Sequence, residues 1–294
     1  MGYILAIISS IFFSLYVIPR KLSKQPALFF SLLMGTGFFV GSVVLYLFRP
    51  IIGFSDKPSL ILLWSVLAGV VWALGFVLFV KSIDGIGLAR SNQWKNLQGP
   101  VGVILCLTIL GEYAKTNPIF AVLAGLAVLL SAVAFTIFNS RAEAKVNLKG
   151  IYLAALSGLA FGTVTVINKY VTVSTGVYLQ QVVWSASIML SLFVYISLFF
   201  KNALQEVKKV DKRNILLGLG AGVLYLGASF FMLQSYRYIP ASIGFTIIQL
   251  NTIWTVAIGI FIFHEIDGKK YFRRIIFGFL FALIGISLLM LAVK

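Results

Sequence analysis

The sequence predicts an all-α membrane protein with ten transmembrane helices, arranged as two inverted five-helix repeats. Hydrophobic residues make up 60% of the 294 residues, charged residues only 11%, and the mean hydropathy is +1.02. Soluble domains are about 45–50% apolar and about 25% charged. Apolar runs of about 20 residues, the length that crosses a bilayer core of about 30 Å, recur along the whole chain. We therefore expect an integral membrane protein.

Ten apolar runs account for most of the chain, and the connections between them are short. No water-soluble domain fits between the runs, so a catalytic domain outside the membrane is excluded. The sequence has no nucleotide-binding loop, metal-ligand cluster or nucleophile–base pair, so we expect no enzyme activity, no cofactor and no metal. The predicted membrane helices, numbered 1 to 10 in chain order, are residues 3–18, 27–48, 60–80, 86–110, 119–138, 150–167, 177–200, 215–233, 241–263 and 275–293.

The basic residues lie mainly in short loops between predicted helices. A net charge of +16 could fit nucleic acid, but most of the 24 Lys and Arg follow predicted helices 1, 3, 5, 7 and 9. In such loops they set the membrane orientation and contact anionic lipid headgroups. We therefore expect membrane lipids as partners and no nucleic acid. The positive-inside rule places these loops in the cytoplasm and both termini outside, in a multi-pass protein of the plasma membrane.

The two halves of the chain, residues 1–140 and 148–294, resemble each other. A constant shift in numbering matches predicted helix 1 to helix 6, and a second shift matches helices 3 and 4 to helices 8 and 9. Because each half has an odd number of helices, the halves insert upside down relative to each other, a common plan of secondary transporters with a midplane site. The matched pairs include Phe13 with Phe161, Lys21 with Lys169, Ser82 with Ser235, Leu97 with Leu250, Glu112 with Glu265, Gln93 with Thr246, Asn96 with Gln249 and Gln98 with Asn251.

Predicted helix 4 has a polar first half at membrane depth. Ionised side chains in hydrocarbon cost about 2.5–3.5 kcal/mol each on insertion scales, so they normally face protein or a water-filled cavity. Arg90 lies near the helix start and either contacts an anion or reaches the lipid headgroups. Pro100 predicts a kink or break, which either lines the site or only helps packing. We expect the solute to be bound by Gln93, Trp94, Lys95, Asn96 and Gln98.

Predicted helix 9 supplies neutral hydrogen-bonding groups at the matching positions, namely Thr246, Gln249 and Asn251. Trp72 and Tyr225, related by the same shift, either face the solute from helices 3 and 8 or form a packing pair buried in the membrane. Aromatic rings are amphipathic contact surfaces, and together with amides they suit sugars and flat metabolites. We therefore expect these five residues to complete the site.

Acidic residues are absent from the middle of every predicted helix, because all eight lie in loops or at helix ends. No carboxylate at membrane depth is available to neutralise Lys95 or to carry a coupling proton. Lys95 therefore either favours an anionic solute or loses its charge through desolvation. A proton relay through this lysine is the third alternative.

Several segments resemble the drug/metabolite transporter superfamily, and within it the glucose/ribose porter family of sugar uptake proteins. The most telling pieces are Trp72-Ala-Leu-Gly75 with Lys81-Ser82, and Gly111-Glu112 at the end of predicted helix 4. The resemblance covers essentially the whole chain, and it implies two inverted repeats around a central cavity walled by helices 1, 3, 4, 6, 8 and 9. The chain departs from that family in helix 4, where Arg90, Trp94 and Lys95 are bulkier and more basic. The segments concerned are VVWALGFVLFVKSIDGIGLARSN, GPVGVILCLTILGEY, VLYLGASFFMLQSYRYIPASIGF and AIGIFIFHE.

These features predict a secondary active or facilitative transporter that moves a small hydrophilic metabolite, a sugar or sugar-like solute, by alternating access. An exporter of amino acids, organic anions or toxic metabolites is the alternative within the transporter class, and a membrane channel is the alternative outside it. The polar groups cluster in one zone of predicted helices 4 and 9, which favours an occluding site over a continuous pore. A coupling proton or cation, and a homodimer, are left open.

Overall fold

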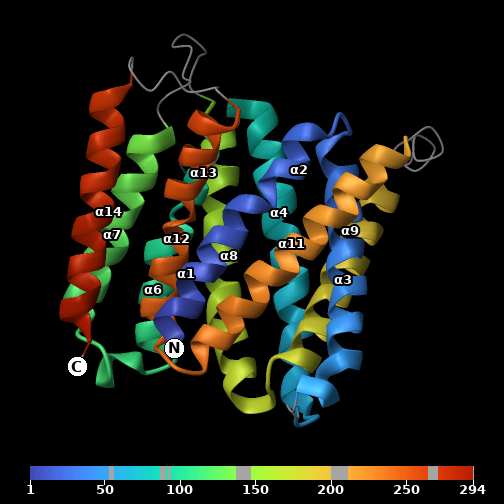
Figure 1. Cartoon of the computed structure of the whole chain (residues 1–294), viewed down its shortest axis with the longest axis horizontal. Coiled ribbons are helices and arrows are strands. Elements are labelled where there is room, and N and C mark those ends of the chain that lie inside the picture. The colour runs from blue at the N-terminus through green and yellow to red at the C-terminus, as the bar shows by residue number, and fades with distance from the viewer. Residues whose placement is uncertain are drawn as a thin grey trace.

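The computed structural model describes residues 1–52, 56–86, 91, 94–136, 147–199, 211–263 and 271–293. These residues form helices and connecting turns without a strand, apart from an isolated bridge between Thr116 and Val293. The helices stand side by side as one bundle, and both termini lie at the same end of it (Figure 1). The predicted all-α class is therefore confirmed for the described residues.

The helices of the described residues follow the predicted order along the chain. Short 3-10 turns at Leu60–Leu62 and Glu112–Ala114 precede α4 and α7. The helices are α1 (Gly2–Leu15), α2 (Val17–Leu22), α3 (Ala27–Ile52), α4 (Leu63–Ile86), α6 (Gln98–Ile109), α7 (Pro118–Thr136), α8 (Leu148–Thr175), α9 (Tyr178–Phe199), α11 (Lys212–Tyr236), α12 (Ala241–Gln249), α13 (Asn251–Phe261) and α14 (Phe272–Ala292).

Seven helical segments of the described residues are long and apolar enough to cross a membrane. They are the consecutive pair α1–α2 and the helices α3, α4, α8, α9, α11 and α14. Predicted helices 4 and 5 correspond to the shorter apolar helices α6 and α7, and predicted helix 9 corresponds to the pair α12–α13. The chain is thus a multi-pass integral membrane protein, and the count of ten crossings stays a prediction.

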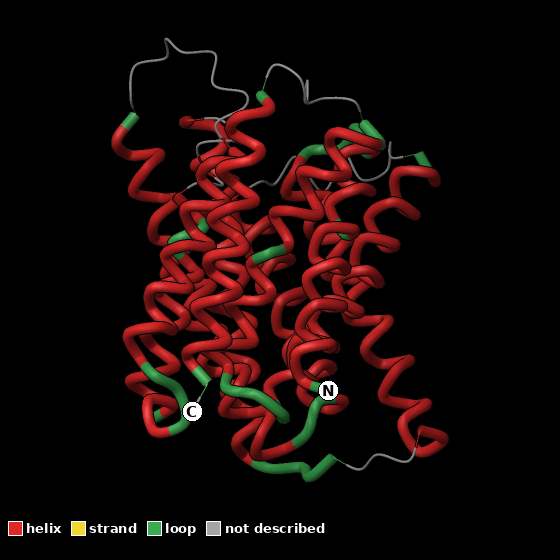
Figure 2. Tube along the Cα trace, turned by 60° about the vertical axis from the view of Figure 1, so that its left-hand side comes forward, coloured by secondary structure: helices red, strands yellow, loops and turns green. Residues whose placement is uncertain are grey.

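Predicted helices 4 and 9 are interrupted inside the bundle. The expected helix over residues 86–110 is corrected here, because α6 begins only at Gln98, after a turn at Asn96 and Leu97. Leu250 alone separates α12 from α13. Short loop segments of this kind lie within the bundle, away from its two ends (Figure 2).

Proline chemistry explains where the first interruption falls. Pro100 is the third residue of α6, a position whose backbone N–H would reach back to the carbonyl of Asn96. Because proline lacks that N–H, the Asn96 carbonyl accepts the N–H of Gly99 instead, at 3.1 Å. Leu250 N–H donates to the Ile247 carbonyl in the same i to i+3 pattern, at 3.0 Å. Both turns therefore make backbone hydrogen bonds within the protein, which a bilayer favours because it offers no partners.

The helices of the two halves pack in matching pairs. α4 lies along α8 just as α1 lies along α11, while α3 contacts α9 and α7 contacts α14. α3 and α11 approach so closely that a Cβ atom at Gly37 would overlap the backbone of Leu219, and one at Gly222 would overlap the backbone of Met34. Such close approach of small residues is a main source of helix association in membranes.

We predict that Gly222→Ala lowers the free energy of unfolding by about 1–3 kcal/mol, because overpacking forces α3 and α11 apart. Gly220→Ala is the matched control, since a Cβ atom there meets nothing within 4 Å. The measurement is the thermal unfolding midpoint of the purified protein in detergent. Equal midpoints for the two variants would contradict the close contact.

Candidate solute-binding site

A cavity of about 110 Å³ lies inside the bundle, among residues of both halves of the chain. Its wall combines aromatic rings with a few polar side chains. A cavity needs only about 10–15 Å³ of such volume to hold a water molecule, so this one can hold several. An apolar and aromatic wall with a few convergent polar groups is the usual make-up of a small-molecule site.

Tyr225 of α11 is the centre of the aromatic wall. It is 4% exposed, and its ring meets rings from α1, α3, α4 and α9 and from the turn after α1. Edge-on ring pairs of this kind add about 0.5–1.5 kcal/mol each beyond the area they bury. The wall is therefore held rigid by contacts between elements far apart in sequence. The ring centroids lie 5.6 Å away for Phe13, 5.4 Å for Tyr16, 5.1 Å for Phe38, 5.6 Å for Trp72 and 6.5 Å for Trp184.

The two interrupted helices meet at this cavity. Gln98, at the start of α6, donates from Nε2 to Oε1 of Gln249, at the end of α12, at 3.0 Å. Asn251, at the start of α13, lines the same cavity. One hydrogen bond at the cavity wall therefore joins a side chain of the first half to a side chain of the second half. Amide groups of this kind can both donate to and accept from a hydroxyl-rich solute.

Lys95 is the charged side chain among the described residues of the lining. Its Nζ lies 5.0 Å from the ring centroid of Phe79 and 6.0 Å from that of Phe161. A cation within about 6 Å of an aromatic face is attracted by the ring quadrupole. The ammonium is thus held between two rings, one from α4 and one from α8.

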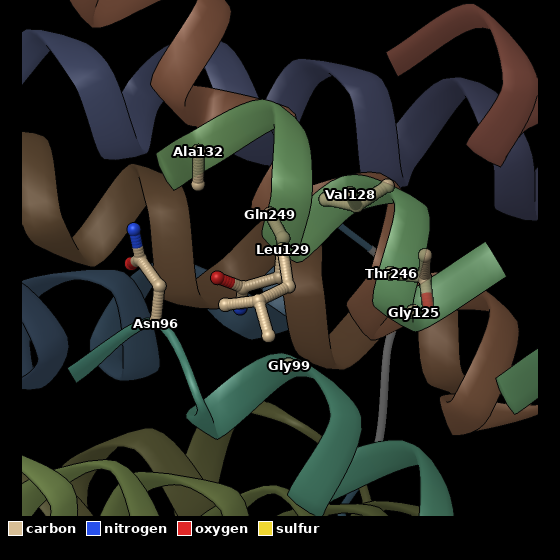
Figure 3. Close-up of a pocket in the computed structure, with 8 residues that line it drawn as sticks. All are labelled: Asn96, Gly99, Gly125, Val128, Leu129, Ala132, Thr246 and Gln249. Carbon is tan, nitrogen blue, oxygen red and sulfur yellow. The ribbon is translucent and has the colours of Figure 1, made fainter. Parts of the chain in front are cut away.

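A second, smaller cavity of about 10 Å³ lies beside the first, between the turn before α6, α7 and α12. Leu129 and Gln249 project toward its middle, with Asn96 to one side (Figure 3). Asn96 is 7% exposed, and its Nδ2 has no hydrogen-bond partner among the described residues. Thr246 also lines this cavity, but its hydroxyl donates back to the carbonyl of Ser242 at 2.8 Å. This space holds about one water molecule.

The predicted site residues therefore divide into four groups. Asn96 and Thr246 line the smaller cavity, and Gln249 lines both. Trp94 is 38% exposed and does not line either of these two cavities. Arg90 and Gln93 lie outside the described residues. The predicted residues that line the larger cavity are Trp72, Lys95, Gln98, Tyr225, Gln249 and Asn251.

Helix α8 supplies part of the lining that the predicted site residues did not include. Phe161, Thr165 and Asn168 all line the larger cavity from this helix. Asn168 is fully buried, and its Oδ1 accepts from Nε2 of Gln180 at 3.3 Å, whereas its Nδ2 has no partner among the described residues. The sequence match between Phe13 and Phe161 could have indicated that α8 contributes to the lining, because both of these residues line the cavity.

Glu112 joins the two halves of the chain near both termini, because Gly2 packs against Ile239 just before α12 and Thr116 pairs with Val293. It is 7% exposed and accepts the backbone N–H groups of Ala241 and Ser242, at 2.6 and 2.8 Å, and the Ser242 hydroxyl, at 2.7 Å. The carboxylate thus caps α12 from the other half of the chain, where the helix dipole favours negative charge. Lys169 of α8 donates to the carbonyls of Tyr236 and Ile239 in the turn before α12, the latter at 3.0 Å.

The described residues contain no group of three or more His, Cys, Asp and Glu side chains that could hold a metal ion. Cys106 is a free cysteine buried in α6. The described lining of the larger cavity offers aromatic faces, amides, hydroxyl groups and the ammonium of Lys95.

The fold and this cavity define a multi-pass membrane protein with an aromatic, amide-lined cavity inside its helix bundle. The model of the family described as "Sugar transport protein" matches residues 34–292, and the chain belongs to that family. The predicted resemblance to sugar uptake porters is thereby confirmed. The chain is a transport protein and not an enzyme.

Relatives with a similar sequence span nearly the whole chain. "Glucose uptake protein GlcU" of Bacillus subtilis (strain 168) is 25% identical over 290 residues, which cover 95% of this chain and 94% of the relative. "Probable glucose uptake protein GlcU" of Bacillus cereus is 26% identical over 294 residues, which cover 96% and 95%. A solved structure, "Crystal structure of protein", has a TM-score of 0.73 at 12% identity and covers 99% of this chain and 96% of that chain, a likeness of fold alone.

We predict that Tyr225→Ala lowers the free energy of unfolding by about 3–5 kcal/mol, because it removes the ring on which five others pack. Tyr225→Phe keeps all five ring contacts and is the matched control. The thermal unfolding midpoint in detergent, followed by tryptophan fluorescence, measures both effects. An alanine variant as stable as the phenylalanine variant would show that the aromatic wall does not depend on this ring.

Proposed function

We propose that the protein takes up a sugar or sugar-like solute through the larger cavity by alternating access. The hydrogen bond between Gln98 and Gln249 is the main support, because it joins the two halves at the wall of that cavity. The sugar transport family and the glucose uptake proteins among the relatives support a sugar as the solute and uptake as the direction. The plasma membrane is the proposed location.

Matching features in the two halves support an inverted repeat over residues 1–140 and 148–294. The interruptions fall at Leu97 and Leu250, which the sequence match pairs. Ser82 and Ser235, another matched pair, each donate a hydroxyl hydrogen bond three residues back, to Phe79 at 2.9 Å and to Met232 at 2.6 Å. In transporters built this way, one repeat rocks against the other and exposes a central site to alternate sides.

Glu112 is the proposed gate on the side of the termini. Its carboxylate belongs to the first half, and the three donors that it accepts from belong to the start of α12 in the second half. Rocking of the halves must separate these groups before the cavity can open on this side. Lys169 supports the gate by holding the turn before α12 through the Ile239 carbonyl, so that the three donors stay aimed at Glu112.

Carboxylates near the cavity would be needed if solute transport were coupled to a proton or cation through an acidic group. Asp56 and Glu112, two of the described carboxylates, accept backbone hydrogen bonds at the starts of α9 and α12, and Asp211 lies just before α11. None of these three described carboxylates lines the cavity. Coupling to a proton or cation through a cavity carboxylate is therefore unsupported in the described residues, and facilitated transport is the simpler proposal.

We predict that Gln249→Ala reduces sugar exchange by about 10-fold or more, because a buried hydrogen-bonding group left without its partner costs about 1–3 kcal/mol. Thr165→Ala should reduce exchange to a smaller degree, because Thr165 lines the cavity and its hydroxyl also bonds the Phe161 carbonyl, at 3.2 Å. Counterflow of labelled glucose in proteoliposomes is the measurement.

Thr163→Ala is the control for these variants. Thr163 sits on the same helix and bonds back to the Leu159 carbonyl at 3.0 Å in the same way, but it does not line the cavity. It should exchange solute like the wild type. Full exchange by the Gln249 variant would remove this cavity from the transport route.

We predict that Glu112→Gln opens the cavity more often toward the side that holds the termini, because the amide cannot accept all three donors. A Met232→Cys reporter in the cavity, with Cys106 replaced by alanine, should then react faster with a membrane-impermeant maleimide added from that side. Vesicles in which the protein is inserted in one orientation, and vesicles with the opposite orientation, allow labelling from the two sides of the membrane to be compared.

The matched control is Asp211→Asn, since Asp211 also precedes a helix but makes no side-chain capping bond. This control should leave the labelling rate unchanged. The gate is disproved if the Glu112 variant labels no faster than the wild type from the side of the termini.

A further inference from the structure

Lys95 has no acidic partner among the described residues. The ammonium contacts the faces of Phe79 and Phe161, and the described part of the lining contains no aspartate or glutamate. Lys95 is partly buried, and a charge that is partly removed from water normally needs an ionic partner or several hydrogen bonds. Two aromatic faces offset only part of the cost of removing an ammonium from water. Among the described residues, the lining therefore offers Lys95 no compensating negative charge.

Lys169 is a lysine of the same protein whose ammonium has hydrogen-bond partners, and it serves as a comparison for Lys95. Its Nζ donates to two backbone carbonyls in the turn before α12, and Glu112 lies close by in that region. Lys95 makes no comparable hydrogen bond to a described residue. The two lysines thus have different surroundings. Lys169 links α8 to the backbone before α12, whereas Lys95 lines the cavity and its ammonium contacts aromatic rings of the described residues.

Asn168 adds a second unsatisfied donor at the same cavity. Its side chain is fully buried, its Oδ1 and carbonyl accept from Gln180, and its Nδ2 donates to no described residue. A buried donor without an acceptor costs about as much as a lost hydrogen bond, so a solute or an ordered water that reached this group would stabilise it. Lys95 and Asn168 therefore both have donor capacity that no described residue uses. The Asn168 Nδ2 has almost no accessible surface, so it would reach a solute only after the side chain turns toward the cavity.

We infer that the solute is a sugar acid, a sugar that carries one carboxylate, and that Lys95 is the residue that selects it over a neutral sugar. This inference rests on the proposed function and narrows its substrate class. Lys95 would pair with the carboxylate, and Asn168 would donate to the same carboxylate or to a neighbouring hydroxyl. The aromatic wall around Tyr225 would pack on the sugar ring, as it would for a neutral sugar.

Lys95 is one positive charge among the described lining residues, and this favours a carboxylate over a phosphate. Lys95 is the charged residue of the described lining, and one ammonium balances one negative charge. A phosphate ester carries close to two negative charges at neutral pH. It would leave one of them uncompensated in a largely aromatic cavity. A sugar phosphate should therefore bind less well than a sugar acid of the same ring size.

Competition in proteoliposomes tests the inference. Purified protein is reconstituted, and counterflow of labelled gluconate and of labelled glucose is measured against unlabelled gluconate, glucuronate, glucose and glucose 6-phosphate. We expect the sugar acids to compete at concentrations at least about 10-fold lower than glucose, because a neutral sugar cannot make the charge-assisted hydrogen bond to Lys95. Glucose 6-phosphate should compete less well than either acid.

Substitutions of Lys95 assign the preference to this residue. Lys95→Gln should lose the preference for the acids while glucose still competes, and Lys95→Arg should keep it. The matched control is Lys81→Gln, because Lys81 also lies over an aromatic ring, that of Tyr195 at 5.6 Å, but does not line the cavity. Thermal stabilisation of each variant by gluconate in detergent gives a readout that does not need transport.

The outcomes separate this inference from the proposed function. Exchange of glucose with no advantage for the acids overturns the inference and leaves sugar transport standing. Exchange of neither glucose nor any acid overturns both. Stronger competition by glucose 6-phosphate than by gluconate overturns the carboxylate assignment. A Lys95→Gln protein that is still stabilised by gluconate as strongly as the wild type overturns the role of Lys95.

Discussion

A polar group inside a bilayer must find its partner within the protein or in the solute, because hydrocarbon offers none. The described helices meet this requirement in regular ways. Ser42, Thr172 and many similar residues donate back to a carbonyl of their own helix, and Gln181 pairs with Ser229 across two helices. Polar groups that remain unsatisfied are therefore informative. Lys95 and the Nδ2 of Asn168 are such groups, and both belong to the lining of one cavity.

The same requirement explains how helices can be interrupted inside the bundle. A turn at Asn96 and Leu97, or at Leu250, would be costly if its backbone groups faced lipid. Each turn instead closes its own hydrogen bonds and brings an amide side chain, Gln98 or Gln249, to the contact between the halves. The interruptions therefore place polar side chains at the cavity while the turns keep backbone hydrogen bonds of their own. The aromatic rings around Tyr225 supply the rigid part of the wall.

Charged residues at the helix starts and at the cavity have separate roles. Asp56 and Glu112 accept the free N–H groups at the starts of α9 and α12, where the helix dipole favours a negative charge. Burial raises the pKa of the Asp56 carboxyl, while its hydrogen bonds from the backbone and the charge of Arg49 oppose that rise. These acids join elements distant in sequence. Lys95 instead lies between aromatic rings at the cavity, where a bound solute can reach it.

The sequence by itself determined the membrane class, the order of the helices, the family and the positions where polar residues interrupt apolar runs. Trp72, Lys95, Gln98, Tyr225, Gln249 and Asn251, expected from the sequence to line the site, lie around one cavity. Hydropathy and helical periodicity could do this because they report which residues a bilayer tolerates. Only the tertiary structure decided which helix faces meet. It placed Asn168 at the cavity, left Trp94 partly exposed, and brought Glu112 to the start of α12, more than 100 residues later in the chain. Such contacts depend on packing between the halves, which local sequence patterns do not encode.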